Sequence, residues 1–177
     1  MNNNEILKAL QRGDESAFEY LFELHCQNLF RYAAIITNNT EDAREIVNET
    51  FFRVFLNSSS VRDYSSFTSW LFRITKNLCM DYLSKRRKNL HILETISKDC
   101  KISGEAESPV NAGNLQESLS VLSQNQKDII ILKDISGYSY AEISSILKKS
   151  ITSLKTAHSR ALKKLACIPE HNERKAD

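Results

Sequence analysis

Cationic side chains near the end of the chain form the part of the sequence with the most definite chemistry. Residues 148–164 contain six lysines and arginines and no carboxylate. Such a segment attracts the phosphates of DNA, because binding to them releases condensed counterions. A solvated helix face can have the same composition, so the elements that carry the cations must decide between these interpretations. The six residues are Lys148, Lys149, Lys155, Arg160, Lys163 and Lys164.

Two short helices joined by a turn are predicted around these cations. Ser139 and Glu142 have the spacing of a capping box, and an apolar helical stripe follows them. Ser150 can cap a second helix after the interruption at 148–149. Because one face of each helix is apolar, both can share a small core, as in a helix-turn-helix that places its second helix in the major groove. The inward residues of the second helix are Ile151, Leu154, His158, Ala161 and Leu165.

A second candidate surface lies on a predicted helix over residues 41–55, which has acidic residues in its first turn. One stripe of this helix is apolar and is expected to face the core. It contains Ala43, Ile46, Val47, Thr50, Phe51, Val54 and Phe55. The neighbouring stripe is polar with one exposed aromatic ring, a combination that suits a protein partner. It contains Glu45, Asn48, Glu49 and Phe52.

A third charged region ends the next predicted helix, which we expect Ser66 to cap. Residues 76–88 hold five basic residues and one acidic residue, so a second basic patch lies far from the first in sequence. Trp70 falls on the inner stripe of this helix, and we interpret it as a core residue. The inner stripe is Phe67, Trp70, Leu71, Ile74, Leu78 and Tyr82.

The composition of the 177 residues favours an all-α fold. There are only four glycines and two prolines, the hydrophobic content is 41%, and the apolar spacing is helical nearly throughout. Two further helices are expected near the start, the first ending near Gly13 and the second capped by Asp14. Four separated cysteines without a CxxC spacing suggest neither disulfides nor zinc, and we expect no cofactor. No apolar run is long enough to cross a bilayer and no signal peptide is evident, so we expect a cytoplasmic protein.

The apolar periodicity fades after residue 89 and resumes near residue 115, which predicts two helical domains. Residues 103–109 have the composition of a flexible acidic linker. We therefore predict a first helical bundle over residues 1–90, a linker over 91–113, a four-helix domain with the helix-turn-helix over 114–170, and a polar tail over 171–177.

Three passages resemble the bacterial RNA polymerase sigma factors of the sigma-70 family, in their short extracytoplasmic-function (ECF) form. In order, they are similar to region 2.2, regions 2.3–2.4 and region 4.2 of that family. The passages are Glu41–Phe55 (EDAREIVNETFFRVF), Phe67–Lys88 (FTSWLFRITKNLCMDYLSKRRK) and Gly137–Leu165 (GYSYAEISSILKKSITSLKTAHSRALKKL). The resemblance covers nearly the whole chain and implies a function in transcription initiation, with core RNA polymerase, promoter DNA and an anti-sigma protein as partners.

The resemblance also implies a function for each surface. Core polymerase is expected to bind Glu45, Asn48, Glu49 and Phe52. The minus-ten element, which is opened as it is read, is expected to bind Tyr64, Arg73, Lys76, Asn77, Lys85, Arg86 and Arg87. The minus-thirty-five element is expected to bind Thr152, Ser153, Lys155, Thr156, Ser159, Arg160 and Lys163. Three residues depart from the common family pattern at the helix-turn-helix: Lys148, Ala157 and His158.

Two other classes of function compete with this interpretation. A one-component regulator would bind an operator through the helix-turn-helix and sense a ligand through its first domain. The second basic patch at residues 76–88 argues against that alternative, because a ligand-sensing domain does not require it. An enzyme finds little support, since the sequence has no phosphate-binding glycine loop, no metal-spaced cluster and no nucleophile motif. We therefore expect no catalytic residue, no metal, no small-molecule substrate and no insertion into a membrane.

Overall fold

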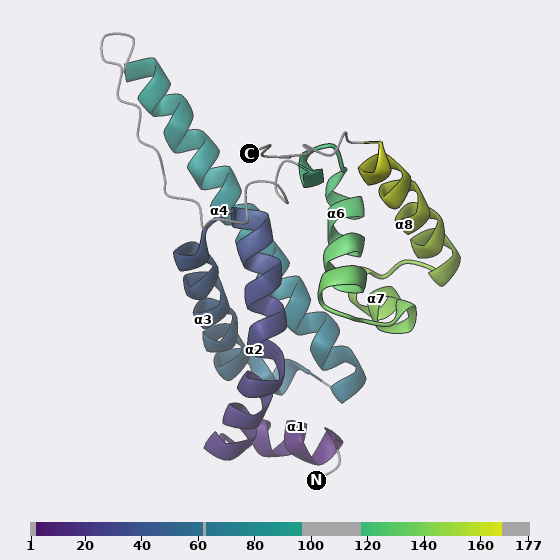
Figure 1. Cartoon of the computed structure of the whole chain (residues 1–177). Coiled ribbons are helices and arrows are strands. Elements are labelled where there is room, and N and C mark those ends of the chain that lie inside the picture. Colours follow the sequence, from purple (N-terminus) through teal and green to yellow (C-terminus); the bar gives the residue numbers. More distant parts are fainter. Residues whose placement is uncertain (1–2, 62, 97–117, 168–177) are drawn as a thin grey trace, which may run out of the picture.

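The computed structural model describes residues 3–61, 63–96 and 118–167, and within these ranges the regular structure is helical, with no strand (Figure 1). This confirms the predicted all-α class. The predicted polar tail, and the predicted linker beyond residue 96, lie outside the described residues. None of the described helices has the length and apolar content needed to cross a membrane.

The first two helices are α1 (Asn3–Gln11) and α2 (Glu15–Thr37), with Gly13 between them in a left-handed conformation at φ 79°. Asp14 caps α2 as predicted, because its carboxylate accepts hydrogen bonds from the backbone N–H groups of Ser16 at 3.0 Å and Ala17 at 3.4 Å. The hydroxyl of Ser16 also donates to this carboxylate, and these hydrogen bonds lower the pKa of Asp14.

The next helices are α3 (Thr40–Asn57), the short 3-10 helix η1 (Ser58–Ser60) and α4 (Tyr64–Ile96). Asn39 caps α3 with its side chain. The predicted cap of α4 at Ser66 is wrong, because the helix begins at Tyr64 and the carboxylate of Asp63 accepts from the N–H of Ser66 at 2.9 Å. The helix also continues to Ile96, past the point at which the apolar periodicity fades.

Helices α1 to α4 enclose a core rich in aromatic and branched side chains, with α2 packed against α3 and α4 (Figure 1). The inner stripe of α3 is buried as predicted except for Phe55, which is 56% exposed. The helical advance of about 100° per residue rotates position 55 past the edge of that stripe. The largest fully buried side chains here are Leu21, Leu29, Tyr32, Val54, Phe67 and Leu71.

The second half of the described chain contains α6 (Gln124–Ile130), one π-helical turn η3 (Ile131–Ile135), α7 (Tyr140–Leu147) and α8 (Ile151–Ala166). Ser123 and Gln126 form a capping box at the start of α6, and Gly137 adopts a φ of 76° after η3. Its buried side chains fall into two clusters. One is continuous with the core of α1–α4 and includes Ile129, Ile131, Leu132, Ile143 and Leu154, and the other consists of Leu119, Leu122, Ile130 and Ala161.

The two halves of the chain contact each other, with α7 packed on α4 (Figure 1). Tyr138, which precedes α7, packs edge-on against Phe72 of α4, with ring centroids 5.3 Å apart. Its hydroxyl also accepts a hydrogen bond from the side-chain amide of Asn28 on α2 at 3.3 Å. Tyr138 is only 9% exposed, and this burial is the main reason that its pKa is raised.

Candidate nucleic-acid interface and partner surface

The predicted helix-turn-helix is formed by α7 and α8. The capping box at its start is confirmed, since the N–H of Ser139 donates to the Glu142 carboxylate at 2.7 Å and the N–H of Glu142 donates to the Ser139 hydroxyl at 3.3 Å. Helix α7 ends at Leu147, and the following residue, Lys148, is left-handed at φ 52° and ψ 47°. A lysine therefore adopts a conformation that glycine accepts more readily, and it does so at the turn between the two helices.

Helix α8 presents its polar and cationic side to solvent. Ser150 caps it by accepting from the N–H of Ser153 at 3.2 Å, while Leu154 and Ala161 are fully buried beneath it. Ile151, predicted to face inward, is 42% exposed because it occupies the first turn, at the edge of the buried stripe. The predicted DNA-contacting residues are all exposed: Thr152, Ser153, Lys155, Thr156, Ser159, Arg160 and Lys163.

His158 connects α8 to η3 and to α7 through its two ring nitrogens. Its Nε2 lies 2.8 Å from the carboxylate of Asp134 in η3, and its Nδ1 lies 2.7 Å from the hydroxyl of Tyr140 in α7. The imidazole is 8% exposed, so this polar arrangement replaces an ordinary apolar contact beneath α8. Sequence reasoning placed His158 on the inner face but missed both partners, because they lie in other elements.

The polar stripe of α3 is exposed and adjoins apolar side chains. Phe52 is 58% exposed, and Phe55 and Leu56 are exposed to a similar degree. Glu45 and Asn48 are also exposed, so the predicted surface is brought together on one helix. A groove of about 550 Å³ runs beside it and is lined by Phe18 and Phe22 of α2 as well as by Asn48, Phe51, Phe52 and Phe55.

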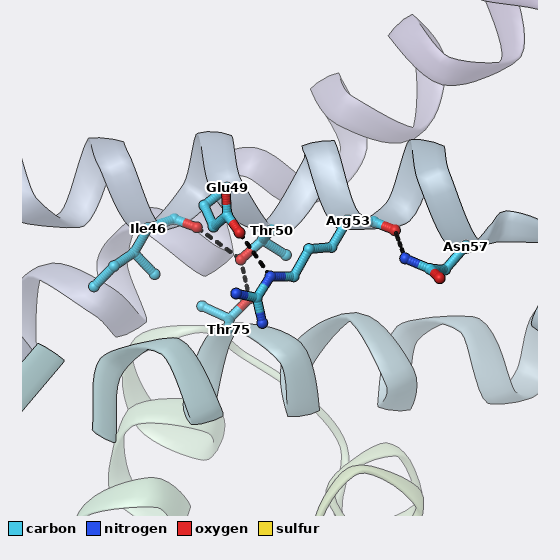
Figure 2. A network of polar contacts seen from close by, with 6 residues as sticks. All are labelled: Ile46, Glu49, Thr50, Arg53, Asn57 and Thr75. Atoms are coloured by element: carbon cyan, nitrogen blue, oxygen red, sulfur yellow. Dashed lines mark hydrogen bonds and ion pairs between the residues drawn. The ribbon is translucent and has the colours of Figure 1, made fainter. Parts of the chain in front are cut away.

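The other side of α3 is fixed to α4 by a polar contact within the core. Figure 2 shows Thr50 directed at Thr75, with the two hydroxyl oxygens 3.2 Å apart, and Thr50 also donates to the carbonyl of Ile46 at 2.8 Å. On the same helix, Glu49 forms an exposed ion pair with Arg53 at 2.7 Å. Because this pair is exposed, it contributes little to stability, at most about 0.5 kcal/mol.

The predicted DNA-binding residues of α4 have different surroundings. Tyr64 is half-buried and stacks on Phe67 at a centroid distance of 5.9 Å, and burial raises its pKa. Lys76 is partly buried, and its ammonium pairs with Asp128 of α6 at 2.5 Å. Sequence reasoning did not identify Asp128. The remaining candidates are exposed: Arg73, Asn77, Lys85, Arg86 and Arg87.

Trp70 lies beside these residues, half-buried, with its ring centroid 6.2 Å from that of Phe67. It borders a cavity of about 1050 Å³ between α4 and α7. Arg73, Lys76 and Asn77 line this cavity from α4, and residues 145–148 line it from the helix-turn-helix. Trp70 is therefore only partly a core residue, because it also borders the space between the two halves of the chain.

Comparison with known proteins identifies the family. Residues 21–89 match the family described as sigma-70 region 2, and residues 112–165 match sigma-70, region 4. The chain is 28% identical over 165 residues to the ECF RNA polymerase sigma factor SigM of Mycobacterium tuberculosis, covering 93% of this chain and 83% of that protein. It is 24% identical to the ECF RNA polymerase sigma factor SigW of Bacillus subtilis, covering 85% of this chain and 87% of the relative.

Two solved structures have a fold similar to that of this chain. The structure of CnrH in complex with the cytosolic domain of CnrY superimposes with a TM-score of 0.72 at 22% identity, over 93% of this chain and 94% of CnrH. The sigma factor RpoE of Bartonella quintana, solved with the anti-sigma factor NepR, gives a TM-score of 0.61 at 26% identity over 84% of this chain and 93% of RpoE.

The order of the helices defines a helix-turn-helix DNA-binding protein. With both family regions present in order and ECF relatives matching most of its length, the chain belongs to the sigma-70 family, in its ECF group. The resemblance stated from the sequence is thus confirmed. The roles of the individual site residues, and the bounds of the two domains, stay predictions.

Proposed function

We propose that this protein binds core RNA polymerase and directs it to promoters. Its first domain would dock on the polymerase and read the minus-ten element, and its second domain would read the minus-thirty-five element. The observation that carries the proposal is the presence of two unlike exposed surfaces on separate regions of one chain. One is the acidic and aromatic face of α3, and the other is the cationic face of α8.

The α3 surface has the chemistry of a protein contact. The carboxylates of exposed Glu45 and partly exposed Glu49 can accept charge-assisted hydrogen bonds from arginines, and exposed Phe52 supplies an apolar anchor. The α8 surface has the chemistry of a duplex contact, since its cations can bind phosphates while its threonines and serines reach base edges. The function we propose for both surfaces is binding and positioning, without catalysis.

The partners and location follow from this proposal. CnrH was solved in complex with the cytosolic domain of CnrY, and RpoE in complex with the anti-sigma factor NepR. We infer a comparable anti-sigma protein for this chain, one that competes for the α3 or α8 surface. Because polymerase and chromosomal promoters are in the bacterial cytoplasm, the protein would act there.

Glu49→Lys tests the docking surface. Reversal of this charge should abolish association with core polymerase, measured by co-purification, and promoter-directed run-off transcription, because the lysine would repel the arginines of a basic partner. The fold should remain, with a shift of a few tenths of a kcal/mol from the lost pair with Arg53.

Glu23→Lys is the matched control, because Glu23 is an exposed carboxylate of α2 outside the groove lining. It should leave both association and transcription unchanged. Retained association in Glu49→Lys would contradict the docking assignment. Tight, specific promoter binding by the free wild-type protein would instead favour the operator-binding regulator.

A further inference from the structure

A tyrosine at the start of α7 lies at the centre of a polar cluster within the second half of the chain. Two ammonium groups lie over the ring of half-buried Tyr140, Lys133 Nζ at 5.0 Å and Lys155 Nζ at 5.8 Å from its centroid. Both distances are within the range of about 6 Å at which an aromatic ring attracts a cation. Tyr140 therefore brings together one cation from η3 and one from α8.

The hydroxyl of Tyr140 fixes the orientation of this ring. It lies 2.7 Å from Nδ1 of His158, whose Nε2 lies 2.8 Å from the carboxylate of Asp134. Because an ionised carboxylate only accepts, Nε2 carries a proton, and a neutral imidazole then accepts from the Tyr140 hydroxyl through Nδ1. An imidazolium would donate through both nitrogens, so both hydrogen bonds are kept in either charge state. The three side chains therefore have the properties of a fixed support and not those of a pH-dependent switch.

The two cations differ in what else holds them. Lys133 is partly buried, and its ammonium also donates to the carbonyl of Tyr138 at 3.3 Å. Lys155 is exposed, and it belongs to the face of α8 that we propose for the minus-thirty-five element. A lysine side chain loses much conformational freedom when it binds a phosphate, and restriction before binding reduces that loss. Contact with the Tyr140 ring provides this restriction and leaves N–H groups of the ammonium available to a phosphate.

We propose that Tyr140, its ring held by His158 and Asp134, is the positioning residue for Lys155 and thereby increases the affinity of α8 for the backbone of the minus-thirty-five DNA. The position of Lys155 in the free protein is independent of the proposed function. The gain in affinity rests on that function, because it requires the outer face of α8 to bind DNA. Since the contact is with phosphate, Tyr140 contributes to affinity without selecting bases.

The position of Lys155 is tested in the free full-length protein by NMR of the lysine ε-methylene protons. Protons above an aromatic ring resonate upfield, so wild type should show an upfield shift at Lys155, and Tyr140→Leu should abolish it. His158→Leu should reduce the shift, because leucine preserves an apolar contact beneath α8 but removes both hydrogen bonds. Lys163, exposed on the same helix, is the control and should resonate at the same position in all three proteins.

Unshifted Lys155 protons in wild type, or an upfield shift that persists in Tyr140→Leu, would overturn the positioning role. An unchanged shift in His158→Leu would overturn the role of His158 alone. Circular dichroism establishes that each variant is folded. If Tyr140→Leu does not fold, Tyr140→Phe replaces it, because it keeps the ring and removes only the hydrogen bond to His158. An unchanged shift in both Tyr140→Phe and His158→Leu would then refute the proposal.

The effect on DNA is tested with a double-variant cycle in the complex with core polymerase. Tyr140→Leu should weaken binding to promoter DNA about two- to fivefold, the range expected from the loss of one exposed cation–π contact. The same substitution should have no further effect in a Lys155→Ala background and its full effect in a Lys163→Ala background. Full effects in both backgrounds would show that Tyr140 acts on the whole of α8 and not through Lys155, which would refute the gain in affinity.

Failure of the proposed function would give a different result. The wild-type protein would then not form a promoter-binding complex with core polymerase, while the upfield shift of Lys155 in the free protein would be unaffected. The two failures can therefore be recognised separately.

Discussion

The outer faces of α3 and α8 are both exposed, but they differ in what they expose. On α3, Phe52, Phe55 and Leu56 are 58%, 56% and 60% exposed beside carboxylates. On α8, the outer face consists mainly of hydroxyl groups and cations. A large apolar exposure next to charges marks a surface that a protein covers, whereas small polar groups with cations suit a polyanion. The difference in exposed chemistry supports the proposal that the two helices bind different partners.

The two helices are also held in place by different means. Helix α3 packs by apolar and aromatic contacts, including Phe51 against Phe22 with ring centroids 4.7 Å apart. Helix α8 buries only the smaller apolar side chains Leu154 and Ala161, and beside them the ring of His158 forms hydrogen bonds to Asp134 and Tyr140. Substitutions that affect folding and binding separately on each helix test this difference.

The largest expected effect is on the free energy of unfolding, and it distinguishes two adjacent phenylalanines of α3. Phe51 is 2% exposed and Phe52 is 58% exposed, so Phe51→Ala should reduce the free energy of unfolding by about 3–5 kcal/mol and Phe52→Ala by less than about 0.5 kcal/mol. Phe52→Ala should nevertheless weaken polymerase association strongly, because it removes the apolar anchor. Urea unfolding and polymerase co-purification measure the two effects. Normal association of Phe52→Ala would show that the exposed face of α3 is not the docking surface.

A smaller effect is expected on α8. Arg160→Ala should weaken binding of the polymerase complex to promoter DNA by about 1–3 kcal/mol, since it removes a cation from the face predicted to enter the major groove. Thermal stability should hardly change, because the side chain is exposed. Arg31→Ala, an exposed arginine of α2, serves as the control and should bind like wild type. Equal affinities for the two variants in a filter-binding assay would argue against α8 as the DNA-binding face.

The smallest effect concerns the turn that orients α8. Lys148→Gly should increase the free energy of unfolding by up to about 1 kcal/mol, because glycine adopts the left-handed conformation at φ 52° without steric cost. Asn38→Gly, at the left-handed end of α2, should change stability less, since asparagine tolerates this conformation better than lysine. Thermal melting of both variants shows which substitution stabilises the protein more. A larger gain in stability from Asn38→Gly would contradict the strain assigned to Lys148.

Local features of the fold could be predicted because neighbouring residues determine them. The caps at Asp14, Ser139 and Ser150 depend on a side chain and an N–H group two or three residues away. The buried stripes of the helices follow from a fixed advance per residue, which is why most inner positions were correct. The predictions that Phe55 and Ile151 face inward were wrong, because each residue lies at the edge of a stripe, where the packing of neighbouring elements decides exposure.

By itself, the sequence determined the helical class, the two unlike exposed faces and the family, because periodicity, composition and ordered motifs are properties of the chain. Only the tertiary structure decided which distant groups meet. Lys76 and Asp128 are separated by 52 positions, and Asp134 and His158 by 24. No local pattern distinguishes a buried, paired carboxylate from a solvated one, because its burial depends on how the helices pack. The tertiary structure therefore revealed that a predicted DNA-binding lysine already has an acidic partner.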